Sequence, residues 1–258
     1  MKSVLRGVGT ATIAFAFALP VSGQTLLRLD PPEGQVSRYV FSMEVTAENP
    51  MMPASGPMMT LRAHQTRTIL TATDEVIRGR TAIDSAAMTN AIPGAGPLPD
   101  LSGSVFTVEI SPRGQHVSTV AEETPSSEAE QVGQDLVEGA EFFSLPEAEV
   151  GTGDSWTETV PVPLSLGGPA QTADVGLTYT LDSMEDGRAT ITFTGPVESS
   201  LDMGGMSANV TGDLTGSMVV DLAEGRYVRQ ESRLNVDVVM AGMAIPTETT
   251  TTLELVTG

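Results

Sequence analysis

Apolar and polar residues alternate over much of this chain of 258 residues. The alternation is clearest at Tyr39, Phe41, Met43 and Val45, which lie at every second position. A period of two is typical of a strand that buries one face and exposes the other. The same pattern recurs at residues 106–110, 175–181, 189–193, 234–240 and 253–255. We therefore predict an all-β fold whose sheet is mainly antiparallel, because antiparallel sheets commonly keep one face in solvent.

The segments between these runs contain turn and loop signals. An Asp-Gly pair at Asp186-Gly187 separates two alternating runs, which predicts a tight hairpin. Residues 49–57 and 90–100 are rich in Pro, Gly and Ala, which predicts longer loops.

Residues 127–143 have helical rather than strand spacing. Ser127 and Glu130 form a capping-box pattern, in which each side chain bonds to a free backbone amide of the other. The apolar residues Ala129, Val132, Leu136, Ala140 and Phe143 follow on one face, before Leu145-Pro146 ends the helix. We expect one amphipathic helix, packed by this stripe onto the sheet.

The helix divides the chain into two comparable β segments. Residues 36–124 and 172–257 each contain a long hairpin and a Gly-Ser pair that leads a strand, Gly103-Ser104 and Gly216-Ser217. We predict a single β-rich domain over 24–258, whose two halves are joined by the helix and by residues 145–165. An internal duplication of the halves stays open, because these strands cannot be aligned far without a shift in register.

The first 23 residues have the features of a cleavable export signal. Lys2 and Arg6 precede an apolar run over 8–19 that is too short to span a bilayer. Pro20 ends the run, and the small residues Val21-Ser22-Gly23 suit signal peptidase. We expect cleavage after Gly23 and a periplasmic or extracellular location, with no membrane span in the mature chain. The chain contains no cysteine, which excludes a lipoprotein anchor and disulfides.

The chain is strongly acidic. Asp and Glu number 33 against 13 Lys and Arg, which gives a formal net charge of -20. Such a surface disfavours nucleic acid and anionic lipid headgroups, because both are bound through clusters of Lys and Arg. Net charge relates to solubility more than to role, so a saline habitat explains this acidity as well as a function does.

One block of motifs resembles a known family. Leu145-Pro146-Glu147, Val150-Gly151 and the run from Gly153 to Thr157 are similar to a motif of an uncharacterised family of exported bacterial proteins, a domain of unknown function. Its early Gly-x-x-x-x-Tyr strand corresponds to residues 34–39. The resemblance implies an antiparallel curved sheet or half-barrel with one helix, and no known activity. More remotely, this architecture is similar to clamshell carriers that hold lipoproteins or lipids in the periplasm.

No catalytic or metal site is readable from the sequence. Gly153-Asp154-Ser155 is similar to the Gly-Asp-Ser block of serine esterases, but their catalytic histidine follows the serine, whereas His64 and His116 precede it. We expect instead a turn at Gly153-Asp154 and a strand that begins with a buried Trp156. His64 should face solvent, and neither histidine has a second His or Cys at ligand spacing. We therefore predict no catalytic residue, no cofactor and no enzyme.

The methionines are the one residue class with a functional pattern. They form pairs near expected turns, at Met51, Met52, Met58, Met59, Met203, Met206, Met240 and Met243. Three interpretations remain open: packing in the core, an adaptable surface for a hydrophobic ligand, and thioether ligands for Cu(I). We favour a non-catalytic binding module for a hydrophobic small molecule, a lipid or an envelope partner. A periplasmic Cu(I)-handling protein is the alternative, and a structural or interaction protein of the envelope is the third.

The export signal predicts the mass of the mature protein. If signal peptidase cleaves after Gly23, the exported chain begins at Gln24. Intact mass spectrometry of the protein recovered from the periplasm or medium measures this directly. Recovery of the full chain in a membrane fraction would contradict the assignment.

Overall fold

A computed structural model describes residues 23–47, 57–90, 99–139, 143–164, 171–202, 207–240 and 242–256. These residues form eleven strands and one helix. The first group of strands comprises β1 (Val36–Ala47), β2 (Met59–Ala72), β3 (Ile77–Asn90), β4 (Val105–Ile110) and β5 (His116–Glu123). The helix α1 (Ser127–Gly139) follows, and then β6 (Ser155–Leu164), β7 (Gln171–Glu185), β8 (Arg188–Asp202), β9 (Ser207–Asp221), β10 (Arg226–Met240) and β11 (Met243–Leu255).

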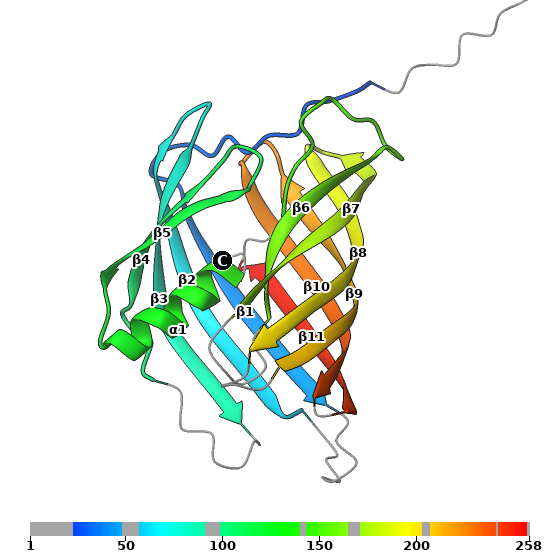
Figure 1. Ribbon diagram of the computed structural model, residues 1–258. Coiled ribbons are helices and arrows are strands. Elements are labelled where there is room, and N and C mark those ends of the chain that lie inside the picture. The colour runs from blue at the N-terminus through cyan, green and yellow to red at the C-terminus, as the bar shows by residue number, and fades with distance from the viewer. Residues whose placement is uncertain are drawn as a thin grey trace, which may run out of the picture.

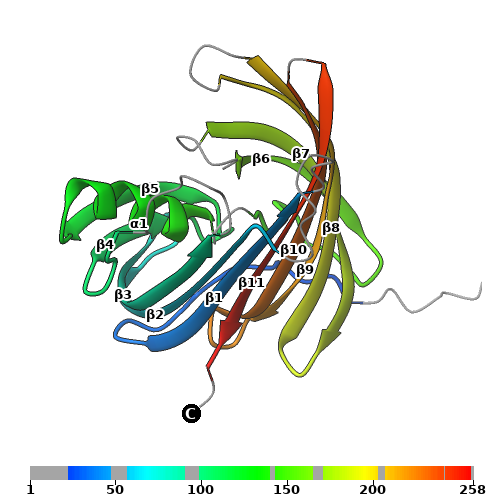
Figure 2. The same cartoon turned by 90° about the horizontal axis from the view of Figure 1, so that it is seen from below.

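All eleven strands belong to one antiparallel sheet, which confirms the predicted all-β fold. Their order is β5-β4-β3-β2-β1-β11-β10-β9-β8-β7-β6, so the first and last strands of the chain pair at its centre. The sheet curves round on itself, with β5 and β6 as its unpaired edges (Figures 1 and 2). The arrangement is therefore the curved, unclosed half-barrel that the family resemblance implied. In the described ranges, no helix is both long and apolar enough to cross a bilayer.

Alternation along each strand separates a buried inner face from a more polar outer face. On β1 the inner side chains of Tyr39 and Phe41 are buried, and Phe41 lies opposite Ala63 on β2 and Leu253 on β11. The predicted inward residues of 106–110, 175–181 and 189–193 are likewise buried. One detail was wrong: Gly216-Ser217 lies inside β9 and does not lead a strand.

Close contact between neighbouring strands allows this curvature. A Cβ atom on Gly212 of β9 would lie 2.0 Å from the carbonyl oxygen of Asn235 on β10. Only glycine permits such an approach of two backbones, and glycines at these positions let a sheet bend sharply. The predicted Asp-Gly hairpin between β7 and β8 is also present, with positive φ angles of 49° at Asp186 and 77° at Gly187.

The N-cap residue of the helix is Ser126, one residue before the cap that the sequence indicated. The hydroxyl oxygen of Ser126, not Ser127, accepts a hydrogen bond from the amide of Ala129 at 3.1 Å. Because the third helical position is then Ala129, the reciprocal bond from Glu130 that a capping box requires is not made. The described helix ends at Gly139, so Phe143 is not part of it, although it is buried.

The expected apolar stripe does pack on the sheet. Ala129 and Leu136 are buried, and Val132 is half-buried against the core. Gly133 allows the helix to approach β4, because a Cβ there would lie 2.6 Å from the ring of Phe106. Ala140, the remaining predicted member of the stripe, lies outside the described residues.

This packing gives a prediction for Leu136, whose side chain is 5% exposed. Leu136→Ala should lower the free energy of unfolding by about 2–4 kcal/mol, through lost burial and the cavity left behind. Gln131→Ala, on the exposed face of the same helix, is the control and should have little effect. Chemical denaturation of both variants measures the difference, and equal midpoints would show that the stripe does not stabilise the fold.

Candidate functional site

The N-terminal segment closes one end of the sheet, which we call the capped end. Leu27 and Leu29 are buried there, and the amide of Leu29 donates to the carbonyl of Pro112 at 2.8 Å in the β4–β5 turn. Thr25 forms an isolated antiparallel bridge with Val150, so the same segment also contacts the chain before β6. The capped end is therefore filled by the protein's own chain.

The motif block shared with the family lies at this end and forms a structural element. The Asp154 carboxylate accepts a hydrogen bond from the amide of Gly151 at 2.8 Å, within the predicted turn. The expected strand follows as β6, in which Trp156 is the second residue, and the indole nitrogen of Trp156 donates to the carbonyl of Ser144 at 2.9 Å. The Trp156 ring, which the sequence predicted to be buried, is half-buried and stacks on Tyr179 at a centroid distance of 5.5 Å.

The serine of the block has no catalytic setting. The Ser155 hydroxyl is exposed and hydrogen-bonds to that of Thr180 at 2.8 Å, across the β6–β7 pair. His64 is exposed on β2, as predicted. His116 is half-buried at the start of β5, where its Nε2 lies 2.8 Å from the Thr119 hydroxyl. Neither imidazole has a recorded contact with Ser155, so the geometry offers no nucleophile–base pair among these residues.

Two arginines that the sequence analysis did not single out hold the block in place. Arg28 donates to the carbonyls of Pro146 and Glu147 at 2.6 and 2.9 Å. Arg113 donates to the carbonyl of Leu145 at 2.8 Å and also pairs with Glu158 on β6. Burial, and then the neighbouring charge of Arg113, lower the pKa of Arg28. No short motif marks either residue, because each acts through backbone carbonyls more than 30 positions away in sequence.

The inner face becomes accessible away from the capped end. On β1, Tyr39 and Phe41 are 2% and 4% exposed, whereas Met43 and Val45 further along are only half-buried. On β11, Leu253 is buried but Thr251 is half-buried. The burial pattern thus divides the inner face into a packed core and an accessible region.

The strand register joins these accessible residues into one surface. Met43 lies opposite Leu61 on β2 and Thr251 on β11, and Leu61 lies opposite Met88 on β3. On the other side, Leu234 of β10 lies opposite Thr249. We call this surface the inner apolar patch, which consists of Met43, Val45, Leu61, Met88, Leu234, Thr249 and Thr251. Apart from Leu61, which is buried, its members are half-buried.

The patch lies on the concave side of the sheet. In the view from below, β1, β11 and β10 form the floor of the curve, and α1 lies to one side, beside β4 and β5 (Figure 2). The packing of Gly133 on Phe106 agrees with this position of the helix. Contacts of α1 reach both β5 and β6, so the helix bridges the two edges of the sheet.

The structure places four of the eight predicted methionines at the patch end of the sheet. Met59 begins β2 opposite Val45, and Met240 lies opposite Met243 at the β10–β11 turn. Met240 packs against the core, whereas Met243 is 55% exposed. The amide of Met58 donates to the carbonyl of Val45 at 2.8 Å. The other four, Met51, Met52, Met203 and Met206, lie outside the described residues, and the Cu(I) hypothesis stays a prediction.

Conventional metal ligands do not gather in the part of the chain that the structure describes. Within it, no group of three or more His, Cys, Asp or Glu side chains could hold a metal ion.

One carboxylate on the bridging helix is perturbed. Partial burial, followed by repulsion from Glu138, raises the pKa of Asp135 above its ordinary value. Glu138 itself accepts a hydrogen bond from Gln134 at 2.9 Å and lies 3.8 Å from His116 on β5. Asp135, Glu138 and His116 are thus ionisable side chains at the junction of the helix with the edge of the sheet.

The raised pKa of Asp135 gives a signed prediction. At pH values below the ordinary pKa of an aspartate, Asp135 is protonated in both the folded and the unfolded chain. As the pH rises through the raised pKa of the folded chain, the partly buried carboxyl of Asp135 ionises, and the free energy of unfolding falls. Asp135→Asn should therefore raise the melting temperature at pH 7 but change it little at pH 3. Thermal unfolding at both pH values tests this, and equal shifts at the two would contradict the burial argument.

Comparisons with known proteins agree with this description. Residues 139–226 match a family of unknown function, DUF6263, over a range that includes the motif block. A solved structure described as showing lipid–protein interactions in lipovitellin has a similar fold, with a TM-score of 0.56 and 12% sequence identity. The similarity covers 88% of this chain and 26% of the lipovitellin chain, so this chain spans about a quarter of that protein. No curated protein matches the sequence significantly.

The comparisons thus confirm the expected resemblance to a family of unknown function and, for the fold alone, to a protein described by its interactions with lipid. The family carries no known function, and the identity to lipovitellin is low enough that the likeness concerns the fold alone.

Proposed function

We propose that the protein is an exported, non-catalytic carrier that binds a hydrophobic small molecule, such as a lipid acyl chain, on the inner apolar patch. The observation that carries the proposal is a row of apolar side chains on a concave face that the rest of the fold leaves half-exposed. A soluble protein commonly keeps such a surface for a ligand or a partner.

The chemistry of the patch suits a flexible apolar ligand. Met43 and Met88 have unbranched thioether chains, which adapt to ligands of varying shape. Leu61 and Leu234 provide aliphatic area, and Thr249 and Thr251 add methyl groups with a hydroxyl each. The described members of the patch include no charged side chain, so the acidic character of the chain does not extend onto this surface.

The similarity to lipovitellin supports the proposal without specifying a ligand, because it concerns the fold. The proposal assigns no chemical step to Ser155, His64 or His116. Export through residues 1–23 is part of it and is tested by the mass of the mature chain.

A matched pair of threonine substitutions tests the patch. Thr251 faces inward beside Met43, whereas the adjacent Thr250 pairs with Glu44 and Arg233 on the outer face. Thr251→Trp should fill the patch and raise the dissociation constant of a hydrophobic ligand by about tenfold, a loss of about 1.4 kcal/mol. Thr250→Trp adds the same side chain outside the patch and should bind as the wild type does.

N-phenyl-1-naphthylamine is a suitable fluorescent probe, because it is neutral and its binding is not affected by the net charge of the protein. Both variants are first checked for an unchanged circular dichroism spectrum and a cooperative melt. Equal probe affinity in the two folded variants would exclude the patch as the binding site. Native mass spectrometry of the wild-type protein then identifies any lipid that is retained on purification.

A further inference from the structure

One buried side chain on the inner face of the sheet presents a polar atom without a partner in the protein. Gln230 of β10 is 3% exposed, and the carbonyl oxygen Oε1 of its side chain is buried without a hydrogen bond. An unsatisfied acceptor in the interior destabilises the folded chain, because the acceptor has lost its water and gained no donor. The atom therefore indicates a position where a further donor can bind.

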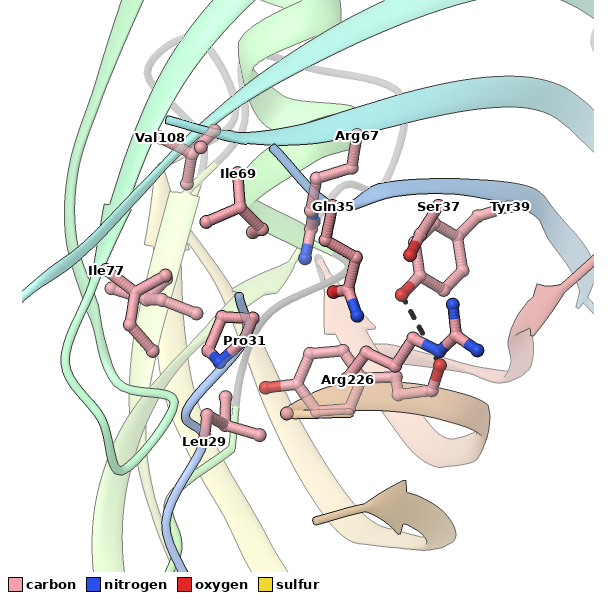
Figure 3. Close-up of a pocket in the computed structure, with 14 residues that line it drawn as sticks. Leu29, Pro31, Gln35, Ser37, Tyr39, Arg67, Ile69, Ile77, Val108 and Arg226 are labelled. Carbon is pink, nitrogen blue, oxygen red and sulfur yellow. Dashed lines mark hydrogen bonds between the residues drawn. The ribbon is translucent and has the colours of Figure 1, made fainter. Parts of the chain in front are cut away.

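A small cavity at the capped end does not supply this donor. Its walls come from the N-terminal segment, from β1 to β4 and from the start of β10, and Figure 3 shows Ser37, Arg67 and Arg226 around it. Its volume of about 30 Å³ holds about two water molecules, which is too little for an organic ligand. Gln230 is not among the 14 residues that line this cavity, so a partner for Gln230 has to approach from another side.

The strand register places Gln230 beside the inner apolar patch. Gln230 lies opposite Leu253 on β11, and Ser232, the next residue of β10 on the same face, lies opposite Thr251. Thr251 belongs to the patch and is half-buried, and it is the diagonal neighbour of Gln230 across the β10–β11 pair. Diagonal neighbours are about 7–8 Å apart, within reach of long side chains. The unbranched side chain of Gln230 can therefore contact a molecule that lies on Thr251.

The surroundings of Gln230 on the inner face carry no charge. Its charged neighbours in the sequence, Arg229 and Glu231, lie on the outer face, where they pair with each other at 2.9 Å and are 54% and 43% exposed. The residues opposite Gln230 and Ser232 on the two neighbouring strands are all uncharged: Leu253, Thr251, Met218 and Gly216. A charged group bound here would have no counter-ion among these residues, and an unpaired charge is strongly disfavoured in such a setting.

We propose that the hydrophobic molecule held on the inner apolar patch ends in an uncharged hydroxyl group, which donates a hydrogen bond to Oε1 of Gln230. A hydroxyl supplies the missing donor without a charge, whereas an ionised carboxylate has no proton to donate. The hydroxyl of Thr251 can donate in turn to the oxygen of the same group. This inference rests on the proposed function and narrows the ligand to long-chain alcohols and acylglycerols, in place of free fatty acids.

A pair of matched ligands tests the head group on the wild-type protein. The compounds 1-decanol and its methyl ether share a chain and an oxygen, but only the alcohol has a hydrogen to donate. Displacement of N-phenyl-1-naphthylamine, followed by its fluorescence, gives the dissociation constant of each. We expect the alcohol to bind about five- to tenfold more tightly than the ether, as one buried hydrogen bond provides. Decanoate, which is ionised at neutral pH, should bind more weakly than the alcohol.

A pair of matched variants then assigns the preference to one side chain. Gln230→Met keeps an unbranched side chain and removes the carbonyl, so it should lower the affinity for the alcohol to that for the ether and leave the affinity for the ether unchanged. Gln65→Met is the control, because Gln65 is 1% exposed on the same face and lies opposite Tyr39 in the packed core. It should keep the wild-type preference for the alcohol. A cooperative melt shows that each variant is folded.

The inference is overturned if the wild-type protein binds the alcohol and the ether equally, a comparison that needs no variant, or if decanoate binds more tightly than the alcohol. A folded Gln230→Met variant that still prefers the alcohol overturns it as well. The carrier function fails by a different result, in which the probe does not bind the wild-type protein or binds Thr251→Trp and Thr250→Trp equally. The failure of the head-group inference and that of the proposed function are therefore distinguishable.

Discussion

The pairing of β1 with β11 is the interaction on which the rest of the structure depends. Nine consecutive residue pairs, from Tyr39 with Leu255 to Ala47 with Thr247, join the two ends of the chain at the centre of the sheet. Because the other strands follow as neighbouring hairpins on either side, the unpaired edges fall at β5 and β6, in the middle of the sequence. The helix that links them in the chain is therefore the element available to bridge the gap between the edges.

The two ends of the curved sheet differ because of where the remaining chain lies. Segment 23–35 and the motif block fill the capped end, where hydrogen bonds from Arg28 and Arg113 to backbone carbonyls hold them. No comparable segment among the described residues covers Met43 and Thr251, which stay half-buried. The motif that carries the family resemblance thus stabilises the fold at the capped end, and the inner apolar patch lies elsewhere on the sheet.

The sequence by itself determined the strands β1, β4, β7, β8, β10 and β11, because period-two alternation is a local property and inward residues such as Phe41 or Leu177 are buried wherever the strand pairs. It also determined the Asp-Gly hairpin and the apolar face of the helix, though not its cap, where Ser126 and Ser127 are equally suited by type. Only the tertiary structure decided that β1 meets β11 and that Met43, Leu61 and Leu234 share one surface. It also brought Arg67 and Arg226, which are 159 positions apart in the sequence, to one cavity. Pairing between strands that are distant in sequence depends on the assembly of the whole sheet, and no local pattern of residues encodes it.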